Sequence, residues 1–318
     1  MFDQNREERL LHMLRDISNR NYKHRWYREI IIYDAKKRCI FSPCFRDHIL
    51  HHLLYAQLYP ILDTKMVHSS FACRVWYGNH RAIASLRHIV RKENRKFILK
   101  WDELYYYKID LSKYFFSIHH SLLKRKLRRY ISDETYLYLI DIILESYSAG
   151  QQYDELLSDF DFYTTTKSKG LPIWSILSQL FANFFLNDFD QFLKHTLKLR
   201  FVRYMDDVVL LWSREELSVA RIRIREFFVK EKLILHPRKQ HFHPVSESIS
   251  FVGYKIRHGK IFVWNRAKQS LLGFIDKYGV HEEVYENNNE LSARLASRCG
   301  AFHHSVRAGQ NYLISLGL

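Results

Sequence analysis

The most informative segment of the chain reads Phe201-Val202-Arg203-Tyr204-Met205-Asp206-Asp207-Val208-Val209-Leu210-Leu211-Trp212. Both of its ends are rich in β-branched and aromatic residues, which is typical of strands, and two adjacent carboxylates lie between them. Neighbouring side chains on a regular strand point to opposite faces, so Asp206 and Asp207 can serve one site only if the chain turns there. Two buried carboxylates without partners are costly unless a cation compensates them. The segment therefore predicts a hairpin that binds a divalent metal, and the alternative is an exposed turn with two solvated aspartates.

A third carboxylate follows a second strand-like segment. Residues 104–109 read Leu-Tyr-Tyr-Tyr-Lys-Ile, and Asp110 comes directly after them. In two-metal sites, divalent ions about 3.5–4 Å apart stabilise the attacking and leaving oxygens of an in-line displacement at phosphorus. Such chemistry needs carboxylates from separate strands that converge on one edge. Asp110, Asp206 and Asp207 match that requirement, so we expect them to form one metal site.

The net charge indicates a polyanionic partner. The chain of 318 residues has 50 Lys and Arg against 34 Asp and Glu, a formal charge of +16, and 15% of its residues are aromatic. Basic side chains bind phosphates and aromatic rings stack on bases, so nucleic acid is the expected partner. A membrane surface is the alternative, but the basic residues are spread along the chain and are not gathered on one amphipathic helix.

Other protein classes are disfavoured. No apolar run approaches the roughly 20 residues that span a bilayer, and the amino terminus is polar. The 4 cysteines show no CxxC spacing, which argues against disulfides and against a zinc ribbon. We therefore expect a soluble, cytoplasmic protein with no membrane partner.

Hydrophobic periodicity divides the chain into helices and strands. Helical spacing predicts helices over residues 8–17, 46–62, 80–92, 121–130, 133–147 and 214–232, a long helix that opens after 170–172 with an apolar stripe through residue 193, and helical structure beyond residue 267. Short apolar runs predict strands over residues 29–33, 38–41, 104–109, 233–235, 249–256 and 261–264. Residues 151–169 are acidic and polar, so we expect a surface loop there.

The order of these motifs resembles that of prokaryotic reverse transcriptases, which include group II intron, retron, diversity-generating and defence-associated enzymes. Residues 204–207 are similar to the YMDD box of that family. The likeness covers nearly the whole chain, because further motifs occur in the family's order: Lys36 and Arg38 in a hairpin, Asp110 to Phe115, Gly170-Leu171-Pro172-Ile173, Ser178-Gln179, Lys239 and Phe251-Val252-Gly253-Tyr254. Residues 178–183, Ser-Gln-Leu-Phe-Ala-Asn, and residues 71–74, Phe-Ala-Cys-Arg, look most like the diversity-generating branch.

The resemblance implies a role for each matching residue. Two Mg²⁺ ions, for which Mn²⁺ can substitute, would be held by Asp110, Asp206, Asp207 and the backbone carbonyl of Leu111. Lys239 resembles the basic residue that assists the departure of pyrophosphate. The nucleotide would be bound by Lys36, Arg38, Arg74, Phe115, Ile173 and Gln179. The template and primer would meet Trp174, Tyr204, Phe251, Gly253 and Tyr254.

Three positions bear on substrate choice. Phe115 would clash with a ribose 2′-hydroxyl and so favour deoxynucleotides, and core packing is the alternative. Trp174 stands where the family has a glycine, which permits close approach of the backbone to substrate, so we expect a reshaped template–nucleotide pocket. Ile173 is apolar where many retroviral-type enzymes place glutamine, a choice that the diversity-generating enzymes share.

The resemblance also implies a fold and an activity. The fold would be an α+β right-hand polymerase, with an antiparallel palm sheet backed by helices. The fingers would span residues 1–100 with an N-terminal helix, the palm residues 101–264 with residues 119–170 contributing to the fingers, and the helical thumb residues 265–318. The activity would be RNA-directed DNA synthesis from dNTPs, with RNA as template or as a structured non-coding partner and DNA as product. An accessory protein or homo-oligomer is a possible further partner.

The biological setting implied by the resemblance is a retroelement or an antiphage defence system. Two other functions stay open. One is a defence polymerase that makes template-independent or repetitive DNA, which Trp174 and the small size of the chain allow. The other is a catalytically idle scaffold that binds RNA. The three-carboxylate set argues against the scaffold, because a scaffold has no physical need for unpaired buried acids.

Overall fold

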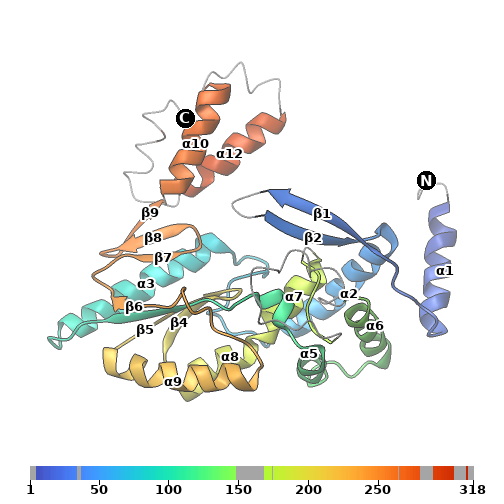
Figure 1. Ribbon diagram of the computed structural model, residues 1–318, viewed down its shortest axis with the longest axis horizontal. Coiled ribbons are helices and arrows are strands. Elements are labelled where there is room, and N and C mark those ends of the chain that lie inside the picture. The colour runs from blue at the N-terminus through green and yellow to red at the C-terminus, as the bar shows by residue number, and fades with distance from the viewer. Residues whose placement is uncertain are drawn as a thin grey trace. The chain divides into compact units, whose positions relative to one another are not determined.

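The computed structural model describes residues 5–33, 37–147, 168–173, 175–263, 265–279, 289–303 and 313. The chain divides into two compact units, and Figure 1 shows their helices and strands. Unit 1 consists of Met1–Val67, Leu111–Asp190 and Glu226–Ile234. Unit 2 consists of His68–Asp110, Gln191–Arg225 and Leu235–Leu318. Both units are therefore built from three separate stretches of chain.

Unit 1 is mainly helical. Its elements are α1 (Arg6–Ser18), the antiparallel hairpin of β1 (Tyr27–Tyr33) and β2 (Lys37–Pro43), α2 (Phe45–Asp63), α4 (Tyr114–Ser117), α5 (His120–Leu127), α6 (Glu134–Glu145), α7 (Ile176–Phe185) and most of α8 (Asn187–Gln191). Helix α2 packs on α7 because each presents a continuous apolar face. On α2 that face consists of Leu50, Leu54, Leu58 and Leu62, which recur every four residues as one side of a helix requires.

Unit 2 contains a four-stranded antiparallel sheet in the order β4-β5-β3-β6. Its strands are β3 (Tyr105–Ile109), β4 (Arg200–Tyr204), β5 (Asp207–Trp212) and β6 (His241–Pro244). Helix α3 (Asn79–Ile98) covers one face, and the first part of α9 (Arg214–Lys230) lies along the other (Figure 1). Arg221 stacks over the rings of Tyr107 and Phe242, at 5.3 Å from each ring centre, and so attaches α9 to its face.

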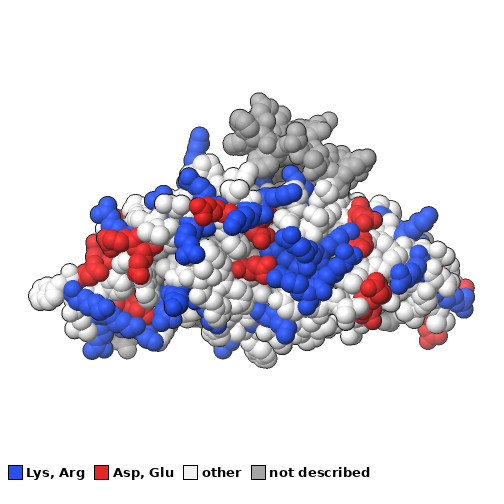
Figure 2. All heavy atoms as spheres, turned by 90° about the horizontal axis from the view of Figure 1, so that it is seen from below, with Lys and Arg blue, Asp and Glu red and all other residues white. Residues whose placement is uncertain are grey.

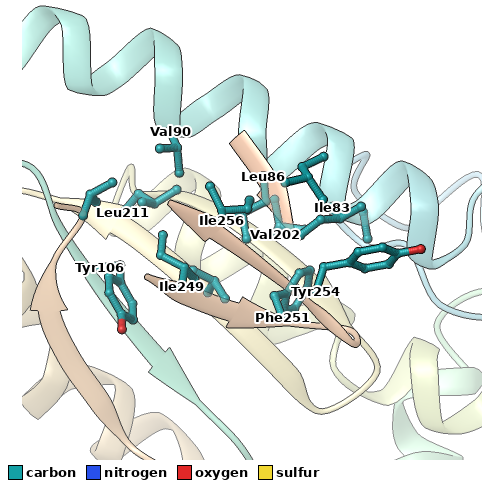
Figure 3. Close-up of a cluster of buried hydrophobic side chains, with 14 of the residues drawn as sticks. Ile83, Leu86, Val90, Tyr106, Val202, Leu211, Ile249, Phe251, Tyr254 and Ile256 are labelled. Carbon is teal, nitrogen blue, oxygen red and sulfur yellow. The ribbon is translucent and has the colours of Figure 1, made fainter. Parts of the chain in front are cut away.

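A second, three-stranded sheet packs against α3. Its antiparallel strands are β7 (Ile249–Phe251), β8 (Tyr254–Arg257) and β9 (Lys260–Val263). Figure 3 shows the shared core, in which residues from α3 and from both sheets meet: Ile83, Leu86, Val90, Tyr106, Val202, Leu211, Ile249, Phe251, Tyr254 and Ile256. Tyr106 alternates with Tyr105 and Tyr107 along β3, so it points to the face opposite α9. Burial of this core holds the second sheet beside the first.

The carboxyl-terminal part of unit 2 has its own apolar cluster. Helices α10 (Asn265–Tyr278) and α12 (Asn289–His303) pack together. Their contact buries Val263, Leu271, Cys299, Phe302 and Leu313. The prediction of helical structure beyond residue 267 is confirmed for these two segments.

Three secondary-structure predictions were wrong. Residues 233–235 form only an isolated bridge at Leu235 and no strand. The single strand expected over residues 249–256 is a hairpin, because Val252 and Gly253 have positive φ angles of 43° and 85° and reverse the chain. The long helix expected through residue 193 is divided into α7, α8 and the π-helical segment Phe192–Thr196, with a break at Leu186 between α7 and α8.

Two further predictions concern the loop at residues 151–169 and the absence of membrane-spanning helices. Most of the loop expected at residues 151–169 lies outside the described residues, which resume at Ser168. Among the helices that the structure describes, none combines the length and the apolar character that crossing a bilayer requires.

Candidate active site

The two adjacent aspartates lie at a tight hairpin between β4 and β5. Tyr204 pairs directly with Asp207, so only Met205 and Asp206 connect the two strands. Met205 has a φ of 55°, in the left-handed region that side-chain-bearing residues rarely adopt. The expected turn is therefore present, and it removes the strand alternation that would send Asp206 and Asp207 to opposite faces.

Asp110 reaches the same end of the sheet from β3. Strand β3 pairs with β5 so that Ile109 is opposite Val208, which places Asp110 one residue beyond the paired end, next to the hairpin. Burial, followed by the charge of Asp110, raises the pKa of Asp206 to about 6. Burial also raises the pKa of Asp207 to about 6, where Lys108 opposes the rise and Asp110 adds to it. The three carboxylates thus interact electrostatically, as the spacing of the motifs predicts.

Two lysines pair with these carboxylates. Lys239 Nζ lies 2.9 Å from Asp110 Oδ2, and Lys108 Nζ lies 3.1 Å from Asp207 Oδ2. The sequence predicts Lys239 as a site residue, but it does not predict Lys108. Lys108 could have been found from its position two residues before Asp110, because residues i and i+2 of a strand share a face.

The donor set fits a divalent metal. Asp207 Oδ1 is buried and has no hydrogen-bond partner among the described residues, so it is free to accept a cation. Carboxylate oxygens are the ligands that Mg²⁺ and Mn²⁺ prefer. Within the described ranges, no group of three or more acidic, histidine or cysteine side chains is arranged so that it could hold a metal ion as it stands. Lys239 and Lys108 each pair with one of the three carboxylates, and a bound metal would compete with both lysines.

The segment before α3 is attached to the β4 strand. Ser70 forms a parallel bridge with Arg203, and the amide of Phe71 donates a hydrogen bond of 2.9 Å to the Arg203 carbonyl. Arg74 lies at the end of this segment, where its guanidinium stacks on the Tyr77 ring at 4.1 Å and donates to the Ser70 carbonyl at 3.0 Å. Arg74 is thus held within unit 2, together with the carboxylates.

The expected primer-binding residues lie at the β7–β8 hairpin. The side chains of Phe251 and Tyr254 are buried in the core shown in Figure 3, and Gly253 is at the turn. Burial raises the pKa of Tyr254 to about 12. A primer that bound this hairpin would therefore meet its backbone groups, as the family resemblance implies, and not these two rings.

The other expected nucleotide-binding residues belong to unit 1. The Leu171 amide donates to the Phe115 carbonyl at 2.8 Å, and the Phe41 amide donates to the Ile173 carbonyl at 3.3 Å. These bonds connect the loop before α7 to α4 and β2. Gln179 lies on α7, and Leu111 is the first residue of the second stretch of unit 1. Lys36, Trp174 and the side chain of Arg38 lie outside the described residues.

Comparison with solved structures identifies the fold. Apo telomerase from Candida tropicalis superposes with a TM-score of 0.55 and 13% identity, over 91% of this chain and 59% of that chain. The same telomerase truncated from its C-terminal domain gives a TM-score of 0.52 and 15% identity, over 75% of this chain and 55% of that chain. The expected α+β polymerase fold is thereby confirmed.

Residues 34–256 match the family of reverse transcriptases (RNA-dependent DNA polymerases), and the chain belongs to that family. Protein YkfC of Escherichia coli (strain K12) is 28% identical over 163 residues, which are 50% of this chain and 38% of YkfC. The chain thus spans less than two thirds of YkfC and of either telomerase chain.

Proposed function

We propose that this protein is an RNA-directed DNA polymerase that uses two divalent metal ions. The preferred ion would be Mg²⁺. One observation carries the proposal: Asp110 and the Asp206–Asp207 turn converge at one end of the unit 2 sheet, with Asp207 Oδ1 buried and unpartnered among the described residues. Family membership supports the same activity. Lys239 and Lys108 offset only part of the negative charge, since the pKa values of Asp206 and Asp207 stay raised to about 6, and a divalent cation would offset the rest.

The reaction joins the primer 3′-oxygen to the α-phosphorus of a dNTP and breaks the bond to pyrophosphate. Asp110, Asp206 and Asp207 would hold the metal ions, which neutralise charge on the attacking and leaving oxygens. Lys239, whose ammonium is partly exposed, would supply positive charge and a proton to the departing pyrophosphate. The β7–β8 turn would hold the primer end through backbone groups, and Phe115 would exclude a ribose 2′-hydroxyl.

An RNA is the proposed template or structured partner. The charge of +16 favours a polyanion, and Figure 2 shows that Lys and Arg side chains gather over the region of α5. Five of the six residues 124–129 are basic in the sequence Lys-Arg-Lys-Leu-Arg-Arg. Four acids, Asp141, Glu145, Asp188 and Glu231, pair with Lys124, Lys126, Arg128 and Arg129 and balance most of the charge of this segment. The net charge of the whole chain is therefore the main support for a phosphate backbone as partner.

The proposed setting is a prokaryotic retroelement or an antiphage defence system. Residues 178–183, Ser-Gln-Leu-Phe-Ala-Asn, support membership of the diversity-generating branch. The similarity to YkfC, a bacterial protein, supports a prokaryotic setting. We further propose that residues 1–100 are fingers, residues 101–264 palm and residues 265–318 thumb, with residues 119–170 contributing to the fingers. An accessory protein or a second copy of the chain is a compatible partner.

The test is DNA synthesis by the purified protein with Mg²⁺ and dNTPs, alone and with RNA from its native host, followed by sequencing of the products. Asp206→Asn should abolish synthesis by removing a metal-binding charge. Asp102→Asn is the matched control, because Asp102 is exposed and its side chain accepts a hydrogen bond from the Glu103 amide, which asparagine can also accept.

Products that copy an RNA and disappear only in Asp206→Asn would support the proposal. Repetitive products without a matching RNA would favour a template-independent defence polymerase. The same three carboxylates could bind the metal ions for that reaction. If the wild type makes no DNA with host RNA present, the polymerase proposal is wrong and an RNA-binding scaffold is favoured.

A further inference from the structure

Lys108 connects three strands of unit 2. It lies on β3, and its ammonium is 3.1 Å from Asp207 Oδ2 at the start of β5. The same ammonium donates a hydrogen bond of 2.7 Å to the backbone carbonyl of Ser250, the middle residue of β7. Only 17% of the Lys108 side chain is exposed, so both contacts are shielded from water. Lysine ammonium groups rarely sit this far inside a fold unless they are paired.

The two oxygens of Asp207 therefore have different surroundings. Oδ2 accepts from Lys108, whereas Oδ1 is buried without a hydrogen-bond partner among the described residues. When one oxygen of a carboxylate is held by a partner, the direction in which the other oxygen points is also fixed. In metal sites, groups that bond to the far side of a ligand orient it and affect affinity nearly as strongly as the ligand itself. Lys108 is placed to act on Asp207 in that way.

The Ser250 contact extends this effect to the second sheet. Strand β7 leads directly into the turn at Val252 and Gly253, which is the proposed primer-holding hairpin. One ammonium thus joins the third carboxylate to the strand that carries that hairpin. Lys108 shares a strand face with Tyr106, which packs in the core between the two sheets.

We propose that Lys108 is a positioning residue that aims Asp207 Oδ1 at the metal and keeps the β7–β8 hairpin in register with the carboxylates. This inference rests on the proposed polymerase function and adds to it a residue that couples metal binding to primer binding. The competing possibility is that Lys108 merely occupies the cation site and must be displaced. The two possibilities predict opposite effects on metal affinity. A positioning lysine strengthens metal binding, and a competing lysine weakens it.

The test compares Lys108→Met, Lys108→Arg and the control Lys100→Met, in which an exposed lysine beyond the end of α3 is changed in the same way. The first measurement is Mn²⁺ binding to the substrate-free protein, followed by the paramagnetic resonance signal of free Mn²⁺. The second is steady-state DNA synthesis with the primer–template concentration varied.

We expect Lys108→Met to weaken Mn²⁺ binding by about 10-fold to 100-fold, as loss of such a supporting partner does. We also expect KM for primer–template to rise with little change in KM for dNTP, because the Ser250 contact is lost as well. Lys108→Arg keeps the charge and should restore part of both, and Lys100→Met should match the wild type. Thermal melting of each variant separates these effects from unfolding.

Two results would overturn the inference. Wild-type or tighter Mn²⁺ binding by folded Lys108→Met would show that the lysine does not support Asp207 and only competes with the cation. An unchanged KM for primer–template would show that the Ser250 contact does not serve the primer. If Lys108→Met does not fold, Lys108→Gln, which also removes the charge, is measured in its place. Because Mn²⁺ binding needs no DNA synthesis, failure of the polymerase proposal would be recognised separately.

Discussion

The guanidinium of Arg203 donates a hydrogen bond of 2.9 Å to the carbonyl oxygen of Met205, the residue that turns the chain into Asp206 and Asp207. A second bond of 2.8 Å goes to Ser70 Oγ. Arg203 is fully buried, and Met205 has the left-handed φ of 55° that costs an ordinary residue about 1–2 kcal/mol. The bond to Met205 therefore stabilises a strained turn on which the positions of both aspartates depend.

Arg203→Met should disturb this turn more than any nearby surface change. Removing the guanidinium takes away the hydrogen bonds that it donates to Ser70 Oγ and to the Met205 carbonyl, and the loss of such a bond to a charged donor costs about 1–3 kcal/mol. We expect the free energy of unfolding in urea to fall by about 3 kcal/mol. We also expect Mg²⁺-dependent synthesis to fall in the fraction that stays folded.

Ser70→Ala is the control for that experiment, because it removes one acceptor of Arg203 and leaves the bond to Met205 intact. Its cost should be about 1 kcal/mol, with synthesis near the wild-type rate. Equal loss of synthesis in Ser70→Ala and Arg203→Met would contradict a specific role for the Met205 bond.

The raised pKa values of Asp206 and Asp207 predict how stability depends on pH without metal. Both are about 6 in the folded protein, against 3.8 for an ordinary aspartate, so between these values the folded state binds more protons than the unfolded state. Stability of the metal-free protein should therefore fall as pH rises from about 4 to about 6 and then level off. Urea unfolding in EDTA across this range measures it, and a rise in stability over the same interval would contradict the assignment.

Metal ions should reverse this trend, because they bind the ionised carboxylates. Asp206→Asn removes one charge from the cluster, so we expect it to stabilise the metal-free protein at pH 7.5 by about 1–3 kcal/mol. Mg²⁺ should raise the melting temperature of the wild type at pH 7.5 and have little effect on Asp206→Asn. Asp102→Asn should behave as the wild type does in both conditions; an equal Mg²⁺ response in all three proteins would place the metal elsewhere.

Phe115 is expected to exclude ribonucleotides. Phe115→Ala should let ATP and GTP replace the deoxynucleotides, because the ring that would meet the 2′-hydroxyl is gone. The measurement is incorporation of dNTP and rNTP in competition, and we expect the preference for dNTP to fall by at least about 10-fold, roughly 1.4 kcal/mol. Phe115→Tyr keeps the ring and should keep the preference. If Phe115→Ala retains full selectivity, Phe115 is a packing residue.

The hairpin at the candidate site could be predicted from the sequence because it is local. Two apolar strands flank a polar pair, and Met205 and Asp206 connect them, so strand periodicity and the cost of burying carboxylates were sufficient. The same reasoning predicted most helices, since a helix such as α2 is recognised from a repeat within a few turns. Asp110 needed one further argument, namely that its strand ends in a carboxylate.

Local sequence patterns did not predict the secondary structure where a strand or a turn leaves no periodic pattern in the sequence. The division of residues 249–256 into β7 and β8 depends on positive φ angles at Val252 and Gly253, and strand β6 has a mixed composition that no strand pattern identifies. Such elements form because a neighbouring strand completes their hydrogen bonds. That neighbour is β8 for β7 and β3 for β6.

Residue types in short motifs were enough to recognise the reverse transcriptase family and to propose Asp110, Asp206 and Asp207 as its metal-binding carboxylates. The groups that support these carboxylates could be found only in the folded chain. Lys108 is 99 residues from Asp207 and 142 from Ser250, and Arg203 is 133 from Ser70. Pairs so distant in sequence are brought together by sheet register and core packing, and these depend on the fold as a whole.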